Sequence, residues 1–163
     1  MEVYILRHAI AEDAAEGQSD AGRRLTPAGE KKLRRVLARA REGGVKPGVI
    51  LTSPYVRAVQ TAEIAKAELG AEAELLQTES LVPFANPFDL WDEIRRYANA
   101  RQVLLAGHNP LLSSLVCFLI GAAGHAIDLK KSALARVDVY SPAPQPRGTL
   151  VWLLTPGSAG GAD

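Results

Sequence analysis

Arginine and histidine side chains follow three short apolar runs of the sequence, close to the point where each run ends. Arg7 and His8 follow the first run, Arg57 lies shortly after the second, and His108 follows the third. Arginine binds a tetrahedral oxyanion through two parallel hydrogen bonds, and a neutral histidine can act as a nucleophile. Together these residue types predict a site that binds a phosphate group.

Arg57 is the most informative of these residues because of its expected place in a helix. Ser53-Pro54 predicts an N-cap followed by proline at the first helical position, so Arg57 falls in the first turn. A cation there costs about 0.3–1 kcal/mol, because the helix dipole is positive at this end, and a bound anion would reverse the sign. The alternative is an arginine that is solvated at the start of a helix.

The other residues have structural alternatives as well. Arg7 and His8 could pair with a nearby carboxylate such as Glu12 or Asp13, because charged groups beside a buried strand require partners. His108 could cap a helix or lie in the core. The phosphate interpretation therefore depends on the joint occurrence of two arginines and two histidines at equivalent places.

Other kinds of site have little support in this sequence. It contains no GxxxxGK[ST] loop, no GxGxxG turn, no GxSxG elbow, and no HxH, HExxH or CxxC pair. We therefore expect neither a metal ion nor any other cofactor. His125 lies in a stretch rich in Gly and Ala and is expected at the surface. Cys117, the single cysteine, is expected in the core.

Apolar strands and amphipathic helices alternate along the chain. Strands are expected at residues 2–6, 49–52, 75–76, 103–106, 133–140 and 149–154. Helices are expected from Thr26-Pro27 to about residue 42, from Ser53-Pro54 to Leu69, over 88–97, and from about 110 to Ile120. This alternation predicts an α/β fold, a three-layer sandwich with a mostly parallel central sheet and helices on both faces.

The predicted sheet also places the polar residues. Ligands of open α/β sheets bind outside the carboxyl ends of the strands, so Arg7, His8, Arg57 and His108 are expected to converge at one edge. The last two strands, joined by a short loop with three prolines, are expected to pair antiparallel with each other.

Length and composition fit one globular domain, expected over residues 1–156, with a flexible tail over 157–163. The chain has 163 residues, 47% of them hydrophobic and 23% charged. Its 19 basic and 18 acidic residues give a net charge of +1, which disfavours nucleic acid as a partner. No apolar run is long enough for a signal peptide or a membrane span, so we expect a cytoplasmic protein without a membrane partner.

Four motifs resemble, in order, the landmarks of the histidine phosphatase superfamily, whose fold is phosphoglycerate-mutase-like. They are Leu6-Arg7-His8-Ala9, Leu25-Thr26-Pro27-Ala28-Gly29, the segment TSPYVRAVQTA at 52–62, and Gly107-His108-Asn109-Pro110. The first motif departs from the usual pattern in having Ala9 in place of glycine. The landmarks extend over residues 1 to about 115.

The resemblance implies a role for each matched residue. His8 would be the nucleophile and become phosphorylated, while Arg7, Arg57 and His108 would bind the transferring phosphoryl group. A glutamate after a middle strand is the general acid in much of the superfamily. Glu79 is the nearest equivalent here, and the alternative is an exposed loop carboxylate.

The segment between Arg57 and His108 is short, whereas mutases and acid phosphatases of the superfamily carry long insertions there. Its length therefore excludes those branches of the superfamily. The sequence thus resembles the branch of the SixA phosphohistidine phosphatases. This resemblance implies a metal-independent phosphatase in signal transduction, whose partner is a protein phosphorylated on histidine. An open site suits such a substrate. The alternatives are a phosphatase of small phosphomonoesters and a catalytically silent module that binds phosphorylated partners.

Overall fold

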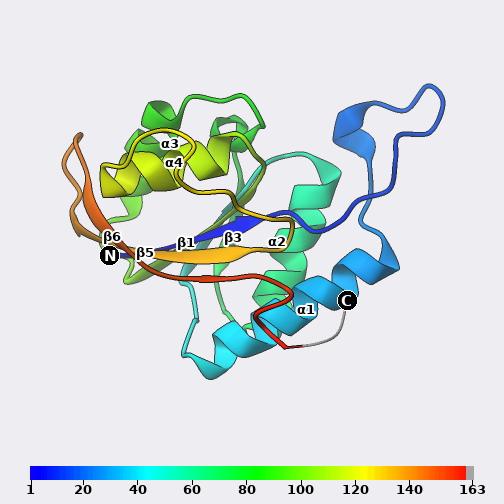
Figure 1. The fold of residues 1–163 in the computed structure, drawn as a ribbon, viewed down its shortest axis with the longest axis horizontal. Coiled ribbons are helices and arrows are strands. Elements are labelled where there is room, and N and C mark those ends of the chain that lie inside the picture. Colours follow the sequence, from blue (N-terminus) through cyan, green and yellow to red (C-terminus); the bar gives the residue numbers. More distant parts are fainter. Residues whose placement is uncertain (161–163) are drawn as a thin grey trace.

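A single mixed sheet forms the centre of the protein, for which the computed structural model describes residues 1–160 (Figure 1). Its strand order is β3-β2-β4-β1-β5-β6. The strands are β1 (Glu2–Arg7), β2 (Val49–Thr52), β3 (Glu74–Gln77), β4 (Gln102–Gly107), β5 (Leu134–Ser141) and β6 (Arg147–Leu154).

The pairing confirms the predicted sheet. β4 pairs in parallel with both β1 and β2, and β2 also pairs in parallel with β3. β5 runs antiparallel to β1, and β6 runs antiparallel to β5. The sheet is therefore mostly parallel and closes on an antiparallel pair at one side.

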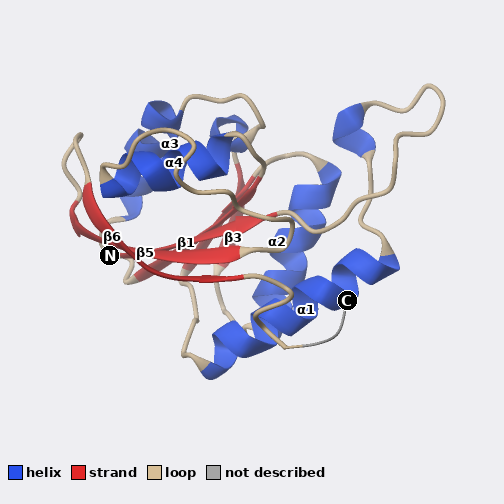
Figure 2. Ribbon diagram, in the orientation of Figure 1, coloured by secondary structure: helices blue, strands red, loops and turns tan. Residues whose placement is uncertain are grey.

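Helices cover both faces of the sheet, which confirms the three-layer sandwich (Figure 2). α1 (Pro27–Glu42) and α2 (Val56–Glu68) lie on one face, and α3 (Pro87–Ile94) and α4 (Leu111–Ile120) lie on the other. Successive residues of a strand point to opposite faces. In β1, Tyr4 and Leu6 pack with α1 and α2, whereas Val3 and Ile5 pack with α3 and α4.

The predicted ends of α1 and α4 are confirmed. Thr26 caps α1, because its side chain accepts a hydrogen bond from the backbone N–H of Gly29 at 3.0 Å, and Pro27 is the first helical residue. α4 ends at Gly121, whose φ of 69° lies in the left-handed region that favours glycine.

The predicted cap of the second helix is wrong. α2 begins at Val56 with Tyr55 as the N-cap residue, and no side chain caps it. Ser53 instead accepts from the backbone N–H of Tyr55 at 3.2 Å and contacts His108, so its hydroxyl serves the turn and the site rather than the helix. Arg57 nevertheless lies in the first turn, as expected.

Other local expectations are met with small changes. The helix expected at 88–97 is α3 followed by a short 3-10 helix, η3 (Arg95–Tyr97). Cys117 is buried and His125 is exposed, as expected.

The expected tail lies only in part within the described residues. Residues 157–160 include a turn in which the backbone N–H of Ala159 bonds to the carbonyl of Thr155, while 161–163 lie outside the described residues. Over residues 1–160, no helix is long and apolar enough to cross a membrane.

Candidate active site

The order of the sheet brings the ends of three strands together, because β4 lies between β1 and β2. The backbone N–H of His8 donates to the carbonyl of Gly107 at 2.9 Å, and that of Ser53 donates to the carbonyl of Ala106 at 3.0 Å. His108 follows directly on β4. The turns after the three strands are therefore neighbours at the carboxyl edge, as expected for parallel strands.

His8 is buried, with 5% of its surface exposed, and its hydrogen bonds select one tautomer. Nδ1 lies 2.7 Å from the carbonyl oxygen of Ala9, which can only accept, so Nδ1 carries the proton. Nε2 then keeps its lone pair and accepts a hydrogen bond from Nε of Arg57 at 3.3 Å. The lone pair of a potential nucleophile thus lies beside a guanidinium that can bind an anion.

Arg57 is only 4% exposed, which excludes a solvated arginine. Nη1 donates to the carbonyl of Asp20 at 2.8 Å, and Nη2 pairs with the Asp20 carboxylate at 3.0 Å. The guanidinium also lies 5.1 Å from the centroid of the Tyr55 ring. Asp20 begins a 3-10 helix, η1 (Asp20–Gly22), so the irregular segment 9–24 reaches the site through this contact.

His108 lies beside His8, with 5.0 Å between the ring centroids. Its Nε2 is 2.8 Å from Oγ of Ser53, which already accepts from the N–H of Tyr55. The Ser53 proton is therefore available to Nε2, and in that tautomer Nδ1 of His108 carries a proton. Nδ1 is buried and has no partner among residues 1–160, so it can donate to an oxyanion.

Arg7 ends β1 and is held by the loop before β5. Nη1 donates to the carbonyl of Leu129 at 2.8 Å, and Nε is buried without a partner in the described part of the chain. This bond replaces the ion pair with Glu12 or Asp13 that the sequence left open. Burial lowers the pKa of Arg7, although an arginine remains charged at neutral pH.

Burial is also the main influence on the two histidines. The pKa of His8 is lowered to about 3, mainly by burial; the Ala9 hydrogen bond opposes this change, and the charges of Arg57 and Arg7 add to it. Burial likewise lowers the pKa of His108 to about 3, with His8 and Arg57 acting in the same direction. Both rings are therefore neutral at pH 7, as a nucleophile requires.

Three residues beside the site were not found by sequence reasoning. Asp20 lies in an irregular polar segment, and Ser53 was interpreted as a helix cap. Ser132 has a φ of 63°, its N–H lies 3.2 Å from the carbonyl oxygens of both Arg7 and His8, and its buried hydroxyl lacks a partner among residues 1–160. Nothing in the spacing of Ser132 marks it, because the contact follows from the path of a loop.

Glu79 lies near the site without joining the cluster. It is exposed and begins a short 3-10 helix, η2 (Glu79–Leu81). Leu81 of that helix packs closely against Gly107, so η2 lies beside the carboxyl end of β4. The Glu79 carboxylate forms no hydrogen bond or ion pair within residues 1–160, so its suggested role as general acid stays a prediction.

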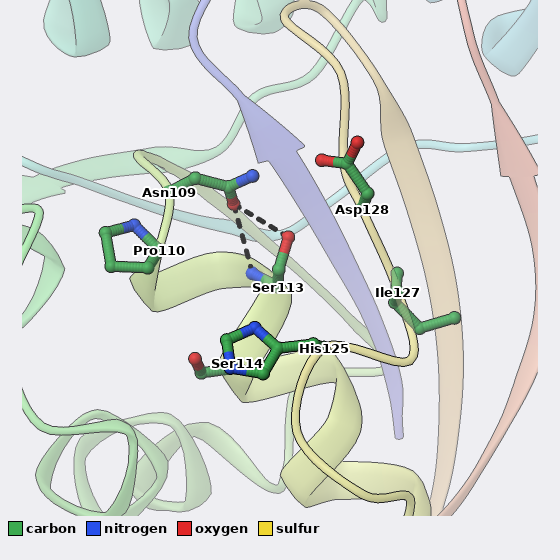
Figure 3. A pocket seen from close by; sticks show the side chains of 7 residues that line it. All are labelled: Asn109, Pro110, Ser113, Ser114, His125, Ile127 and Asp128. Carbon is green, nitrogen blue, oxygen red and sulfur yellow. Dashed lines mark hydrogen bonds between the residues drawn. The ribbon is translucent and has the colours of Figure 1, made fainter.

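A hollow of about 380 Å³ lies next to His108, between the start of α4 and the loop before β5 (Figure 3). Asn109 joins two sides of this hollow. Its Oδ1 accepts hydrogen bonds from the backbone N–H and the hydroxyl of Ser113, and its Nδ2 donates to the carbonyl of Leu129. That same carbonyl accepts from Arg7. Asn109 therefore helps to fix the loop on which the position of Arg7 depends.

The depressed pKa values have a testable consequence for stability. Between about pH 6.5 and 3 the unfolded chain binds protons at His8 and His108 that the folded protein does not bind, so the free energy of unfolding falls as pH falls. The slope of the free energy of unfolding against pH reaches about 1.4 kcal/mol per pH unit for each histidine. Urea unfolding at pH 7 and pH 5 should show a smaller difference for His8→Asn than for wild type. An unchanged difference, with His125→Asn as control, would contradict the low pKa of His8.

Comparison with known proteins identifies relatives of this chain in sequence and in fold. A sequence model of the histidine phosphatase superfamily (branch 1) matches residues 3–81, which include Arg7, His8, Arg57 and Glu79. An uncharacterized protein of Picosynechococcus sp. is 38% identical over 136 residues, which are 82% of each chain. A solved structure of the protein histidine phosphatase SixA, complexed with tungstate, is 30% identical, with a TM-score of 0.84 over 96% of this chain and 98% of that chain.

The chain therefore belongs to the histidine phosphatase superfamily, and its fold is phosphoglycerate-mutase-like. Within the superfamily it is strongly similar to SixA over nearly its whole length. A candidate alpha-ribazole-5′-P phosphatase from Escherichia coli is 17% identical, with a TM-score of 0.70 over 96% of this chain and 98% of that chain, which shows a shared fold alone. The class of enzyme is thus a phosphatase.

Proposed function

We propose that His8 is the nucleophile of this phosphatase and that the reaction passes through a phosphohistidine intermediate without a metal ion. The observation that carries the proposal is the tautomer of His8, whose unprotonated Nε2 lies beside Arg57. The neutral state of the ring supports it further, because a protonated imidazole has no lone pair to donate.

In the first step Nε2 of His8 forms a bond to phosphorus while the bond from phosphorus to the leaving group breaks. Arg7 and Arg57 balance the charge on the equatorial oxygens, which is most of what phosphoryl transfer requires of a protein. Nδ1–H of His108 donates to the same group. Water then attacks the phosphohistidine, which gives inorganic phosphate and restores neutral His8.

We infer that the substrate is a phosphohistidine carried on a protein, in cytoplasmic signal transduction. The segment between Arg57 and His108 supports this substrate class. After α2 it contains one α-helix, α3, which packs in the core. Leu90, Trp91 and Ile94 of α3 pack into the core beside α4, so α3 does not roof the phosphate pocket. An uncovered pocket admits a folded protein, whereas a small metabolite is usually enclosed. The similarity to SixA points the same way.

Glu79→Gln tests the substrate class. Imidazole is a weaker base than an alkoxide, so it leaves phosphorus with less help from a general acid. We therefore expect Glu79→Gln to slow the hydrolysis of aryl or sugar phosphates more than that of a protein phosphohistidine. The measurement is kcat/KM of wild type and variant on a phosphohistidine-bearing protein and on a panel of small phosphomonoesters.

Glu93→Gln is a suitable control for Glu79→Gln, because its carboxylate is bonded to the hydroxyl of Thr78 in the same region. The phosphomonoesterase alternative would be established by two results together. Wild-type kcat/KM would be several orders of magnitude higher on one small ester than on the phosphohistidine-bearing protein, and Glu79→Gln would lose that activity. An absence of turnover on every substrate, including a generic aryl phosphate, would instead favour a silent phosphate-binding module.

A further inference from the structure

A second hollow, of about 550 Å³, opens beside Arg7 on the side of the sheet that carries α1. Four of the side chains that line it are cationic and none is acidic. Its lining residues are Arg7, Ile10, Lys32, Lys130, Lys131, Thr155, Pro156 and Gly157. They come from the start and end of the chain, from α1 and from the loop before β5, and Figure 1 shows the segment after β6 running beside α1.

This concentration of charge is local. The whole chain has a net charge of only +1, so a wall with four cations is not a consequence of a basic protein. The Lys130 charge is partly balanced by Asp128, which lies beside it and belongs to the neighbouring hollow. Lys131 is exposed and forms no ion pair among residues 1–160. Lys131 therefore adds positive charge to this wall of the hollow.

Arg7 links this hollow to the candidate phosphate site. Arg7 belongs to both, since its guanidinium contacts the loop that carries the two lysines while its backbone adjoins His8. The Lys131 charge is close enough to His8 to act on its ring. A phosphorylated group bound at His8 would thus have its flanking residues within reach of Lys130 and Lys131.

We propose that this hollow docks acidic side chains that flank the phosphohistidine of a protein substrate. The inference rests on the proposed function and names the kind of protein surface it acts on. The residue types favour an extended protein segment over a small anion. Arginine suits bidentate recognition of one small group, whereas lysines on long flexible stems provide diffuse charge that steers and orients a partner.

The test uses two synthetic peptides, each phosphorylated on a single histidine with phosphoramidate. One carries glutamates on both sides of the histidine and the other carries glutamines. At low salt we expect wild type to favour the glutamate peptide by about tenfold in kcat/KM, through faster association. In 1 M salt the preference should vanish, because the Debye length falls to about 3 Å.

The Lys130→Gln/Lys131→Gln double variant should lose the preference at low salt. The ratio between the two peptides is the readout, so any general effect of the substitutions on catalysis cancels. Lys46→Gln/Lys66→Gln removes the same charge from residues near the opposite edge of the sheet and should retain the full preference. A double variant at Lys130 and Lys131 that keeps the ratio would overturn the docking proposal.

Two further outcomes separate this inference from the proposed function. Wild type that hydrolyses both peptides equally well at low salt would refute acidic docking while supporting the phosphohistidine substrate. Failure on both peptides, with turnover of an aryl phosphate, would contradict the substrate class itself. If a small aryl phosphate with an added carboxylate gains as much as the glutamate peptide, and through the same lysines, the hollow binds small anions and the docking proposal fails.

Discussion

His8→Ala is expected to abolish turnover while leaving the fold intact. The side chain supplies the only protein atom that forms a bond to phosphorus in the proposed reaction, so no partial function should remain in the phosphoryl-transfer step. Its backbone N–H still donates to Gly107 in the variant, because that bond does not involve the imidazole. Far-ultraviolet circular dichroism should therefore match that of wild type.

A rapid-quench experiment with labelled substrate provides the direct measurement. Wild type should carry label on His8 in an acid-labile, base-stable form, as expected for a phosphoramidate, and His8→Ala should carry none. His125→Ala is a matched control, since it removes an exposed histidine that is not part of the phosphate pocket. Turnover that persists in His8→Ala would disprove the assignment of the nucleophile.

Arg57→Ala is expected to lower kcat/KM by about 10²-fold or more. Arg57 contacts Nε2 of His8 directly, so its guanidinium lies where charge develops during phosphoryl transfer. Loss of one such hydrogen-bond donor lowers the catalytic rate by about 10²-fold or more. Arg57→Lys should recover only part of the loss, because an ammonium keeps the charge without the planar fork.

The same variant should have a small effect on the free energy of unfolding. Removal of a cation from a helix N-terminus is favourable by about 0.3–1 kcal/mol, and loss of the Asp20 contacts opposes it by a similar amount. Thermal unfolding without phosphate measures the net change. Arg23→Ala is the control, because Arg23 also pairs with Asp20 but does not contact His8. A large destabilisation confined to Arg57→Ala would assign Arg57 a structural role instead.

The convergence of the catalytic candidates was predictable because it depends only on the sheet. Arg7, His8 and His108 follow buried parallel strands at once, and such strands end at a common edge whatever the details of the loops. Arg57 was predictable because Val56 to Glu68 is helical and places it in the first turn. The continuous apolar run of β1 likewise predicted a buried strand, and its successive side chains enter the cores on opposite faces of the sheet.

The contacts made by loops could not be predicted in this way. Asp20 reaches Arg57 across 37 positions of sequence, from a segment without helical or strand periodicity. Ser132 takes a left-handed backbone conformation that serine seldom adopts, so no local propensity indicates it. Ser53-Pro54 has the composition of a helix cap, and only the contact with His108 redirects the hydroxyl.

The place of β4 in the sheet has a consequence for the growing chain during synthesis. β1 and β2 do not pair with each other, and each pairs with β4, which is the last of the three to be made. A nascent chain that already contains Arg7, His8 and Arg57 therefore has no strand to hold them at one edge. We therefore expect the complete phosphate site to assemble only after residues 102–108 have left the ribosome.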